Sequence, residues 1–521
     1  MATVEQAQTT TDSGAPTVDV FCPADGRLVG SVPDMGAPEV EQIAAQLRAA
    51  QPAWEAIGPE GRARHMLAWL DWIFDNEDRI LELVQQESGK SYGDTKIEIL
   101  ATAEVINYYA KHAGEFLADQ HPRPHELASS TKSLHLFRKP YQLVGEIFPW
   151  NYPLAMPMLD VPPALMAGAA VLSKPSEFTP LAWTECVRGW NEIAAPPVLG
   201  LANGAGAAGA AVIDVVDMIM FTGSTRTGRK IAVRAAERLI PAALELGGKD
   251  AMIVLDDADM ERAVNGATWG GLFNAGQTCI AVERVYVEEP IYDEFVAKLT
   301  EKVSGLRTGM DAPGTYQSDL GSLATEAQLE IVERHVQDAK DRGARVLTGG
   351  KPTGQGLIYE PTVLVDVDHT MQCMTEETFG PTIPVMKVAN EAEAIRLAND
   401  SPYGLNGSVY TGDNDRGIRV ARQMETGGVS VNNAMMTLFQ FPLPFGGWKE
   451  SGIGGRFGGP AGLLKYCRQQ SVTTERIKLA SEIHWYPYTK RRGRVAAHLT
   501  RILGARGWRR RLGLKRKGSP E

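Results

Sequence analysis

The sequence predicts an α/β fold built from more than one domain. Short, continuously apolar stretches alternate with amphipathic helical stretches over most of the chain, which is typical of parallel strands covered by helices. The 521 residues also exceed what one hydrophobic core usually organises. With 44% hydrophobic and 22% charged residues, the composition is that of a globular protein.

Individual elements follow from the apolar pattern in chain order. Buried strands are expected to end at Lys174 and to occupy MIMF (218–221) and AMIVL (251–255), because these runs are uninterruptedly apolar. A helix is expected over 326–343, where apolar residues recur at helical spacing until a glycine ends the pattern. The strand ARVLT follows, and a helix and a strand alternate again over 391–411.

The N-terminal stretch and the cysteines indicate a cytoplasmic protein without a metal site. Residues 1–16 lack the pattern of a secretory signal and are expected to be a disordered lead, and no run of about 18 apolar residues is present to span a bilayer. The five cysteines are odd in number and widely spaced, which argues against a disulfide framework and a zinc cluster. His121 and His125 are separated by two prolines that prevent a helix from aligning both rings.

Charge is unevenly distributed between the body of the chain and its C-terminal end. The net charge is −10, yet residues 483–520 hold twelve Lys and Arg and no Asp or Glu, so the remainder carries about −22. An acidic body disfavours sequence-independent binding to nucleic acid. We therefore expect no nucleic-acid partner.

Cys279, in NAGQTCIAVER (274–284), is the candidate nucleophile. A free thiol has a pKa of about 8.5 and needs a nearby base, dipole or cation to react as a thiolate. Gly276 lets the backbone bend closely around a reacting group, and Thr278 and Cys279 can present backbone N–H groups to it. For this stretch alone, a buried structural cysteine is the more frequent explanation.

Two further stretches carry groups that could assist such a thiol. In LELGGKD, Glu245 precedes paired glycines, and a partly buried glutamate has a pKa raised toward the range of a general base. In FPWNYP, two prolines fix a turn whose Asn151 amide could donate to a developing oxyanion. The alternatives are a surface glutamate before a turn and an ordinary proline-rich turn.

Two stretches suggest a bound nucleotide. In MIMFTGSTRTGRKIA an apolar strand runs into Gly223 and Ser224, and Gly228 is expected to open a helix whose N-terminus would lie near phosphate. This departs from the usual G-x-G-x-x-G pattern. In AAVLSKPSEFTP a strand ends at Lys174, and Glu177 could accept both hydroxyls of an adenosine ribose while repelling a 2′-phosphate.

Together these stretches resemble the aldehyde dehydrogenase superfamily. The family's motifs are matched in order over roughly residues 17–480 by PWNYP, KPSE, FTGSTRTG, ELGGK, NAGQTC, EETFGP and PFGGWKESGIG. Glu245 precedes Cys279 by 34 residues, as the family pattern requires. The resemblance implies an α/β fold with a Rossmann-type NAD-binding domain (17–120 and 141–247), a catalytic domain (248–457), a small β oligomerisation element (121–140 and 458–482) and, beyond the family pattern, a basic tail (483–521).

The resemblance also implies a role for each matching residue. Cys279 would add to the aldehyde carbon, giving a thiohemiacetal that passes hydride to the nicotinamide and becomes a thioester. Glu245 would activate the water that hydrolyses this thioester, and Asn151 and the backbone N–H of Cys279 would form the oxyanion hole. The cofactor implied is NAD, with NADP as an alternative. The residues implied for cofactor binding are Trp150, Lys174, Glu177, Gly223, Ser224, Gly228, Leu246, Glu377 and Phe379.

The expected substrate pocket is apolar. The stretch VNNAMMTLFQFPLPFGG (431–447) resembles the loop at the mouth of the family's substrate tunnel and holds no charged residue. Because a semialdehyde's carboxylate would be unpaired there, the loop favours an apolar aliphatic or aromatic aldehyde. Plain core packing, or an arginine elsewhere that pairs with such a carboxylate, are the alternatives. The residues expected in the pocket are Tyr152, Thr278, Ile280, Phe439 and Phe445.

The tail is basic and amphipathic. Four apolar residues are expected on one helical face, with arginines largely around it and aromatic residues beside it. An anionic membrane surface attracts such a segment, so peripheral contact with the inner face of the membrane is one expectation. A solvated tail, or a tail folded onto the acidic body of a partner subunit, are the others. The apolar face comprises Val495, Leu499, Ile502 and Leu503, the arginines are Arg491, Arg492, Arg494 and Arg501, and the aromatic residues are Trp485, Tyr486, Tyr488 and Trp508.

The leading hypothesis is therefore an NAD-dependent aldehyde dehydrogenase that releases a free carboxylic acid. A succinic or other semialdehyde is the alternative substrate. A CoA-acylating enzyme generally lacks a base at Glu245, and a catalytically idle, membrane-associated member of the family would not need Cys279, Glu245 and Asn151 in register. The family resemblance further implies a homodimer or homotetramer, joined through a strand resembling SLHLFRKPY and the chain after Gly459.

Overall fold

The computed structural model describes residues 8–10, 16–125, 129–482 and 484–514. The chain divides into two compact units, a larger one (Met1–Phe116 and Pro140–Cys467) and a smaller one (Leu117–Lys139 and Arg468–Glu521). Both large sheets and the candidate site belong to the larger unit. In the described part of the chain, no helix is both long and apolar enough to cross a bilayer.

The first large sheet described has six strands. The strands in its centre are buried along their whole length, and one of them contains the apolar run MIMF that the sequence predicts as a strand. All neighbouring strands are parallel except the first pair, which is antiparallel. In spatial order the strands are β19 (Gly452–Ile453), β9 (Ala242–Glu245), β8 (Met218–Thr222), β5 (Leu143–Ile147), β6 (Ala170–Lys174) and β7 (Leu199–Leu201).

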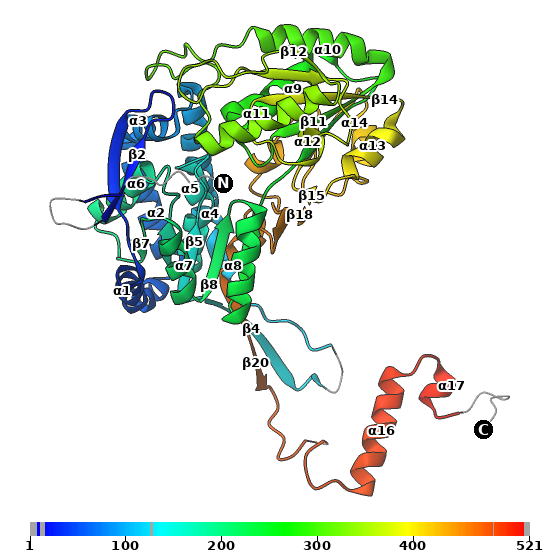
Figure 1. Ribbon diagram of the computed structural model, residues 1–521. Coiled ribbons are helices and arrows are strands. Elements are labelled where there is room, and N and C mark those ends of the chain that lie inside the picture. Colours follow the sequence, from blue (N-terminus) through cyan, green and yellow to red (C-terminus); the bar gives the residue numbers. More distant parts are fainter. Residues whose placement is uncertain (1–7, 11–15, 126–128, 483, 515–521) are drawn as a thin grey trace. The chain divides into compact units, whose positions relative to one another are not determined.

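Helices from the N-terminal half of the chain pack around this sheet (Figure 1). They are α1 (Ala37–Ala56), α2 (Gly58–Asp75), α3 (Glu77–Ser88), α4 (Tyr92–Leu117), α5 (Ala155–Ala167), α6 (Leu181–Glu192), α7 (Gly206–Val215) and α8 (Thr225–Glu237). The sequence placed the start of α8 at Gly228, and that prediction is wrong by three residues. The helix begins at Thr225, because the Ser224 side chain accepts a hydrogen bond from Thr227 N and caps it.

The second large sheet described has seven strands. Only β12 is antiparallel to its neighbour, and the other pairs are parallel. In spatial order the strands are β12 (Arg345–Thr348), β13 (Thr362–Val365), β14 (Thr382–Val388), β11 (Val282–Glu288), β10 (Asp250–Val254), β16 (Gly407–Tyr410) and β17 (Ser430–Val431).

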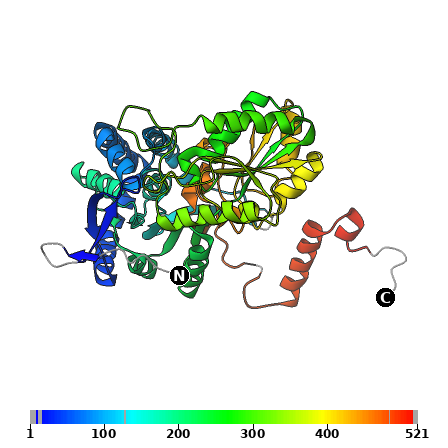
Figure 2. The same cartoon turned by 45° about the horizontal axis from the view of Figure 1, so that its top comes forward.

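Helices cover both faces of the second sheet (Figures 1 and 2). Side chains alternate along β10: Ile253 packs in one apolar cluster with α11, α13 and α14, whereas Met252 and Val254 pack in another with α9 and α10. These helices are α9 (Met260–Leu272), α10 (Glu289–Ser304), α11 (Glu326–Asp341), α12 (Gln372–Thr375), α13 (Glu391–Asn399) and α14 (Asn414–Ala421). The α/β fold predicted from the sequence is confirmed, and the helix expected over 326–343 is α11.

Shorter elements complete the larger unit. They are the pair β15 (Tyr403–Gly404) and β18 (Trp448–Lys449), the 3₁₀ helices η2 (Phe273–Gly276) and η3 (Met436–Phe439), and the helix α15 (Gly459–Leu464). A small antiparallel sheet consists of β1 (Gln8–Thr10), β2 (Pro16–Phe21) and β3 (Leu28–Pro33). Residues 8–10 and 16 thus differ from the disordered lead expected over 1–16, because β1 pairs with β2. Residues 1–7 and 11–15 of that expected lead lie outside the described residues.

The smaller unit holds a two-stranded sheet and the C-terminal helices. The strand β4 (Lys132–Pro140), which contains the expected SLHLFRKPY strand, pairs with β20 (Cys467–Glu475). The helix expected in the basic tail is α16 (Lys490–Gly504), followed by α17 (Trp508–Arg511). Residues 458–467, which the sequence grouped with the oligomerisation element, belong instead to the larger unit, where α15 packs against α5.

Candidate active site

Cys279 lies in the loop between η2 and β11. The backbone before it is left-handed at three consecutive residues, with φ of 55° at Asn274, 54° at Ala275 and 73° at Gly276. A Cβ on Gly276 would lie 2.1 Å from Gly380 O, so only glycine allows this close approach. The loop is therefore tightly constrained, and Cys279 remains partly exposed at its end.

Glu245 is the last residue of β9, and the chain that follows it lies against Cys279. A Cβ on Gly248 would lie 2.2 Å from the backbone oxygen of Cys279. Glu245 is 1% exposed, and its Oε1 has no hydrogen-bond partner among the described residues. Burial raises the pKa of Glu245 to about 8, which is the range of a general base at neutral pH.

A buried arginine, Arg456, partly opposes the burial that raises the pKa of both Cys279 and Glu245. Burial, followed by the charge of Glu245, raises the pKa of the Cys279 thiol, while Arg456 acts in the opposite direction on the pKa of Cys279 and of Glu245. Arg456 is 1% exposed and donates from Nε and Nη2 to Asp160 Oδ2 at 3.1 and 3.0 Å. Asp160 also pairs with Lys465 at 3.3 Å. The site thus has a fixed positive charge close to its thiol and carboxyl.

Asn151 lies in the turn before α5 and is joined to the Cys279 loop. Its Nδ2 donates to Gln277 O at 3.0 Å, and its own carbonyl oxygen accepts from Asn274 Nδ2 at 3.0 Å. Next to it, Tyr152 OH lies 2.6 Å from Thr278 Oγ1. The side-chain amide nitrogen of Asn151 carries two N–H bonds, so one remains to donate to the oxyanion that develops when the Cys279 sulfur attacks a carbonyl carbon.

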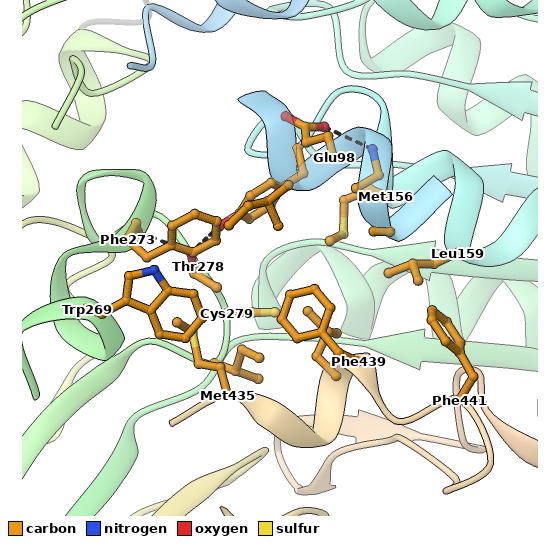
Figure 3. Close-up of a pocket in the computed structure, with 16 residues that line it drawn as sticks. Glu98, Met156, Leu159, Trp269, Phe273, Thr278, Cys279, Met435, Phe439 and Phe441 are labelled. Carbon is orange, nitrogen blue, oxygen red and sulfur yellow. Dashed lines mark hydrogen bonds between the residues drawn. The ribbon is translucent and has the colours of Figure 1, made fainter. Parts of the chain in front are cut away.

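Cys279 opens into an apolar pocket (Figure 3). Of the five residues expected there, Tyr152, Thr278, Ile280 and Phe439 line it. Phe445 does not: it is buried and stacks on Phe457, with ring centroids 4.9 Å apart. The expectation for Phe445 is wrong because its ring stacks on Phe457, whereas Phe439 and Phe441 of the same loop line the pocket. The complete lining is Ile97, Glu98, Ala101, Tyr152, Ala155, Met156, Leu159, Trp269, Phe273, Thr278, Cys279, Ile280, Met435, Leu438, Phe439 and Phe441.

The residues expected at a cofactor lie at the ends of the first sheet's strands and beside Glu245. Lys174 ends β6 and its Nζ lies 3.5 Å from Glu177 Oε2. Gly223, Ser224 and Gly228 surround the start of α8. Leu246 directly follows Glu245 and is buried.

A second group of these residues lies across from Gly248. Glu377 Oε1 accepts a hydrogen bond from Gly248 N at 2.8 Å, and burial raises the pKa of Glu377 to about 8. The rings of Trp150 and Phe379 meet edge to face with centroids 5.5 Å apart. The structure therefore gathers these three residues near the stretch that joins Glu245 to the second sheet.

Several residues of the site were not anticipated from the sequence. Lys90 lies in the short connection between α3 and α4, and Glu98 and Trp269 lie in α4 and α9, where the sequence pattern gives no sign that these side chains face a reacting group. Asp160 and Arg456 are 296 residues apart, so their pairing is visible only in the fold. Met435 was within the apolar loop 431–447 and could have been named from it.

The chain is similar to aldehyde dehydrogenases over most of its length. The model of the aldehyde dehydrogenase family matches residues 9–472. The "4,4'-diapolycopene aldehyde oxidase" of a Methylomonas species is 37% identical over 91% of this chain and 88% of its own. A Mycobacterium ulcerans protein with the provisional name succinate-semialdehyde dehydrogenase (NADP+) 2 is 38% identical over 87% of each chain.

Solved structures agree with this match. The crystal structure of a Mycobacterium tuberculosis aldehyde dehydrogenase complexed with NAD+ superposes with a TM-score of 0.83 and 35% identity, covering 88% of this chain and 94% of that one. The resemblance read from the motifs is confirmed, because the family model spans both large sheets together with Cys279, Glu245 and Asn151. The chain therefore belongs to the aldehyde dehydrogenase family and is an oxidoreductase that acts on aldehydes.

Proposed function

We propose that this enzyme oxidises apolar aldehydes, aliphatic or aromatic, to free carboxylic acids with NAD as its cofactor. The observation that supports this substrate class is the lining of the pocket at Cys279. Its charged member, Glu98, already accepts hydrogen bonds at both carboxylate oxygens, and no Lys or Arg lines the pocket in the described part of the chain. A substrate carboxylate would therefore be desolvated there without a counter-charge.

The names of the relatives point to two kinds of aldehyde. The Methylomonas protein is named for an aldehyde on a hydrocarbon skeleton, whereas the M. ulcerans protein is named for succinate semialdehyde, which carries a carboxylate. A lining without Lys or Arg among the described residues favours the first kind for this chain. Succinate semialdehyde remains the second candidate because of the similarity to the mycobacterial relative.

The proposed chemistry begins at Cys279. Its sulfur adds to the aldehyde carbon, and the amide of Asn151 and the backbone N–H of Cys279 donate to the oxygen that becomes negative. A nicotinamide held by Glu377 and Phe379 would supply the acceptor for the hydride that leaves the adduct carbon, and the adduct on Cys279 would then be a thioester. Glu245 then takes a proton from water, the resulting hydroxide attacks the thioester carbon, and the carbon–sulfur bond breaks to release the acid and the thiolate.

The proposed cofactor site fits a dinucleotide in its donors and charges. The N-terminus of α8 is capped by Ser224, and its first turn carries no acidic side chain, so its N–H groups favour phosphate. Lys174 and Glu177 lie beside the same sheet edge, where they would bind the adenosine ribose. Glu377 and Phe379 would hold the nicotinamide ribose and ring.

An aldehyde panel tests the proposed substrate. Apolar aliphatic and aromatic aldehydes should give kcat/KM values at least 10-fold above that of succinic semialdehyde, because an unpaired buried carboxylate costs more than about 1.4 kcal/mol. The measurement is initial NADH formation for each aldehyde at matched enzyme concentration. A preference for succinic semialdehyde would refute the proposed substrate class while leaving aldehyde oxidation intact.

Glu177 should determine the choice between NAD and NADP. Replacing Glu177 by Gln removes the charge that repels a 2′-phosphate, so we expect the ratio of kcat/KM for NAD over NADP to fall by about 10-fold or more. Replacing Glu192, an exposed glutamate at the end of α6, by Gln serves as the matched control. An unaltered ratio in the Glu177 variant would show that this carboxylate does not contact the ribose.

We also propose that the basic tail makes peripheral contact with an anionic membrane surface at the cytoplasmic face. In α16, Val495, Leu499, Ile502 and Leu503 are 46%, 43%, 37% and 41% exposed, although they share one helical face. Basic residues surround this face, and the aromatic side chains of Trp485, Tyr486, Tyr488 and Trp508 are exposed beside it. Such a helix buries its apolar face at the acyl boundary while its cations meet lipid phosphates.

Vesicle sedimentation tests this contact. The full chain should bind vesicles that contain phosphatidylglycerol and should be released by high salt, because surface charges are screened. It should not bind pure phosphatidylcholine. A variant with Leu499→Glu and Ile502→Glu, which retains every basic residue, should lose most of the binding, whereas absence of binding by the full chain would rule the contact out.

The proposed assembly is a homodimer or homotetramer joined through the β4 and β20 pair. A second copy could add a strand at an edge of this pair, although Leu136 of β4 already exchanges backbone hydrogen bonds with Gln120. Sedimentation of the intact chain gives its mass directly.

A further inference from the structure

A buried ion pair lies beneath the loop that carries Asn151. The side chains of Lys90 and Glu98 are 2% and 0% exposed, and Lys90 Nζ lies 2.6 Å from Glu98 Oε1. Moving two charges out of water is costly, and an apolar pair of similar volume is often as stable. Stability of the fold alone therefore gives little reason for this pair, so its contacts must explain it.

Both members of the pair hold the segment 151–155. Lys90 Nζ donates to the carbonyl oxygen of Asn151 at 2.9 Å and lies 4.4 Å from the centre of the Tyr152 ring. Glu98 Oε2 accepts from the backbone N–H groups of Leu154 and Ala155, each at 2.9 Å. These are orphan donors at the N-terminus of α5, where a negative charge is favourable. The backbone is thus fixed on both sides of Tyr152.

The fixed segment is hydrogen-bonded directly to the loop that carries Cys279. Asn151 Nδ2 donates to Gln277 O at 3.0 Å, and Tyr152 OH lies 2.6 Å from Thr278 Oγ1. Asn151 Oδ1 is buried and has no hydrogen-bond partner among the described residues. The amide is therefore held by its nitrogen and its backbone alone, and a shift of that backbone would move the amide relative to the sulfur.

We propose that Lys90 and Glu98 are positioning residues for Asn151. The ion pair holds the backbone of Asn151 so that its second amide N–H is aimed at the oxygen that forms when Cys279 adds to an aldehyde. The pair acts through Asn151, and the inference rests on the proposed oxyanion role of that residue. A misplacement of about 1 Å in such a group can cost about 100-fold in rate.

A double-mutant cycle tests the proposal. Glu98→Gln retains the size of the side chain and removes the charge that pairs with Lys90. We expect it to lower kcat by roughly 10- to 100-fold with little change in KM. The loss should vanish when Asn151 is already alanine, so that the double variant is no slower than Asn151→Ala alone.

A second readout needs no cofactor. A 4-nitrophenyl ester acylates a reactive thiol and releases coloured nitrophenolate, so the rate of the burst reports oxyanion stabilisation at Cys279 alone. Glu98→Gln and Asn151→Ala should each slow this burst, and combining them should slow it no further. Asp217→Asn breaks another ion pair of the larger unit, 2.7 Å from Arg48, and should leave the burst unchanged.

The outcomes separate the two proposals. Equal losses from Glu98→Gln in the wild-type and the Asn151→Ala backgrounds would overturn the positioning role while leaving the role of Asn151 intact. An unchanged burst and kcat in Asn151→Ala alone would overturn the oxyanion role and the positioning role together. If Glu98→Gln does not fold, Glu98→Asp retains the charge but draws the carboxylate back by one methylene, and the same non-additive loss is expected.

Discussion

Replacing Cys279 by Ala should lower kcat for aldehyde oxidation by on the order of 10⁴-fold or more, because no other group can carry the covalent adduct. The remaining cysteines described are buried or lie at β20, and none of them lines the pocket. Binding of NAD, measured by calorimetry, should be unaffected, since the cofactor residues proposed here do not depend on the sulfur. The loss therefore belongs to the chemical step and not to the cofactor site.

Cys186→Ala is the matched control, because it deletes a buried thiol on α6 that does not line the pocket. Labelling with iodoacetamide gives an independent readout: one site that reacts in the wild-type chain and in Cys186→Ala should be absent in Cys279→Ala. Because burial and Glu245 raise the pKa of the thiol, this labelling should accelerate with rising pH. Retained turnover in Cys279→Ala would refute the assignment of the nucleophile.

The sequence predicted those site residues whose side-chain type by itself suggests a chemical role. A thiol, a carboxyl and an amide in ordered motifs identified Cys279, Glu245 and Asn151 as candidates. In the structure, the loop that carries Cys279 contacts both the Asn151 side chain and the chain that follows Glu245. The alternation of apolar runs and helical stretches predicted the α/β fold for the same reason, since strand and helix each have a fixed period.

The parts that could not be predicted depend on distances between segments. The roles of Lys90 and Glu98 follow only from the fold, which brings their side chains to the backbone of Asn151 and Leu154. In the same way, Asp160 pairs with Arg456 although the two are 296 residues apart in sequence. Phe445 was assigned to the pocket because it belongs to an apolar loop, yet its ring turns to Phe457. Composition cannot distinguish the two faces of such a loop.

Replacing Glu245 by Gln should stop the reaction after hydride transfer. Gln cannot take a proton from water, so we expect the acyl group to remain on Cys279 and kcat to fall roughly 10²- to 10⁴-fold. Rapid mixing should show a burst of NADH close to one equivalent per active site, followed by slow turnover. Hydroxylamine attacks a thioester without a base and should restore turnover in this variant. Glu237→Gln, at an exposed position on α8, should show neither effect.

The pH dependence gives the same test in the wild-type chain. Burial raises the pKa of Glu245 to about 8, so near pH 7 only about a tenth of the carboxyls are ionised and able to act as a base. Where hydrolysis limits turnover, kcat should rise with pH and level off above about pH 8. In Glu245→Gln this rise should be lost. A variant that keeps the rise would show that a group other than Glu245 titrates. A variant that lacks the NADH burst would show that Glu245 serves a step no later than hydride transfer, because only a block after hydride transfer lets the first equivalent of NADH form.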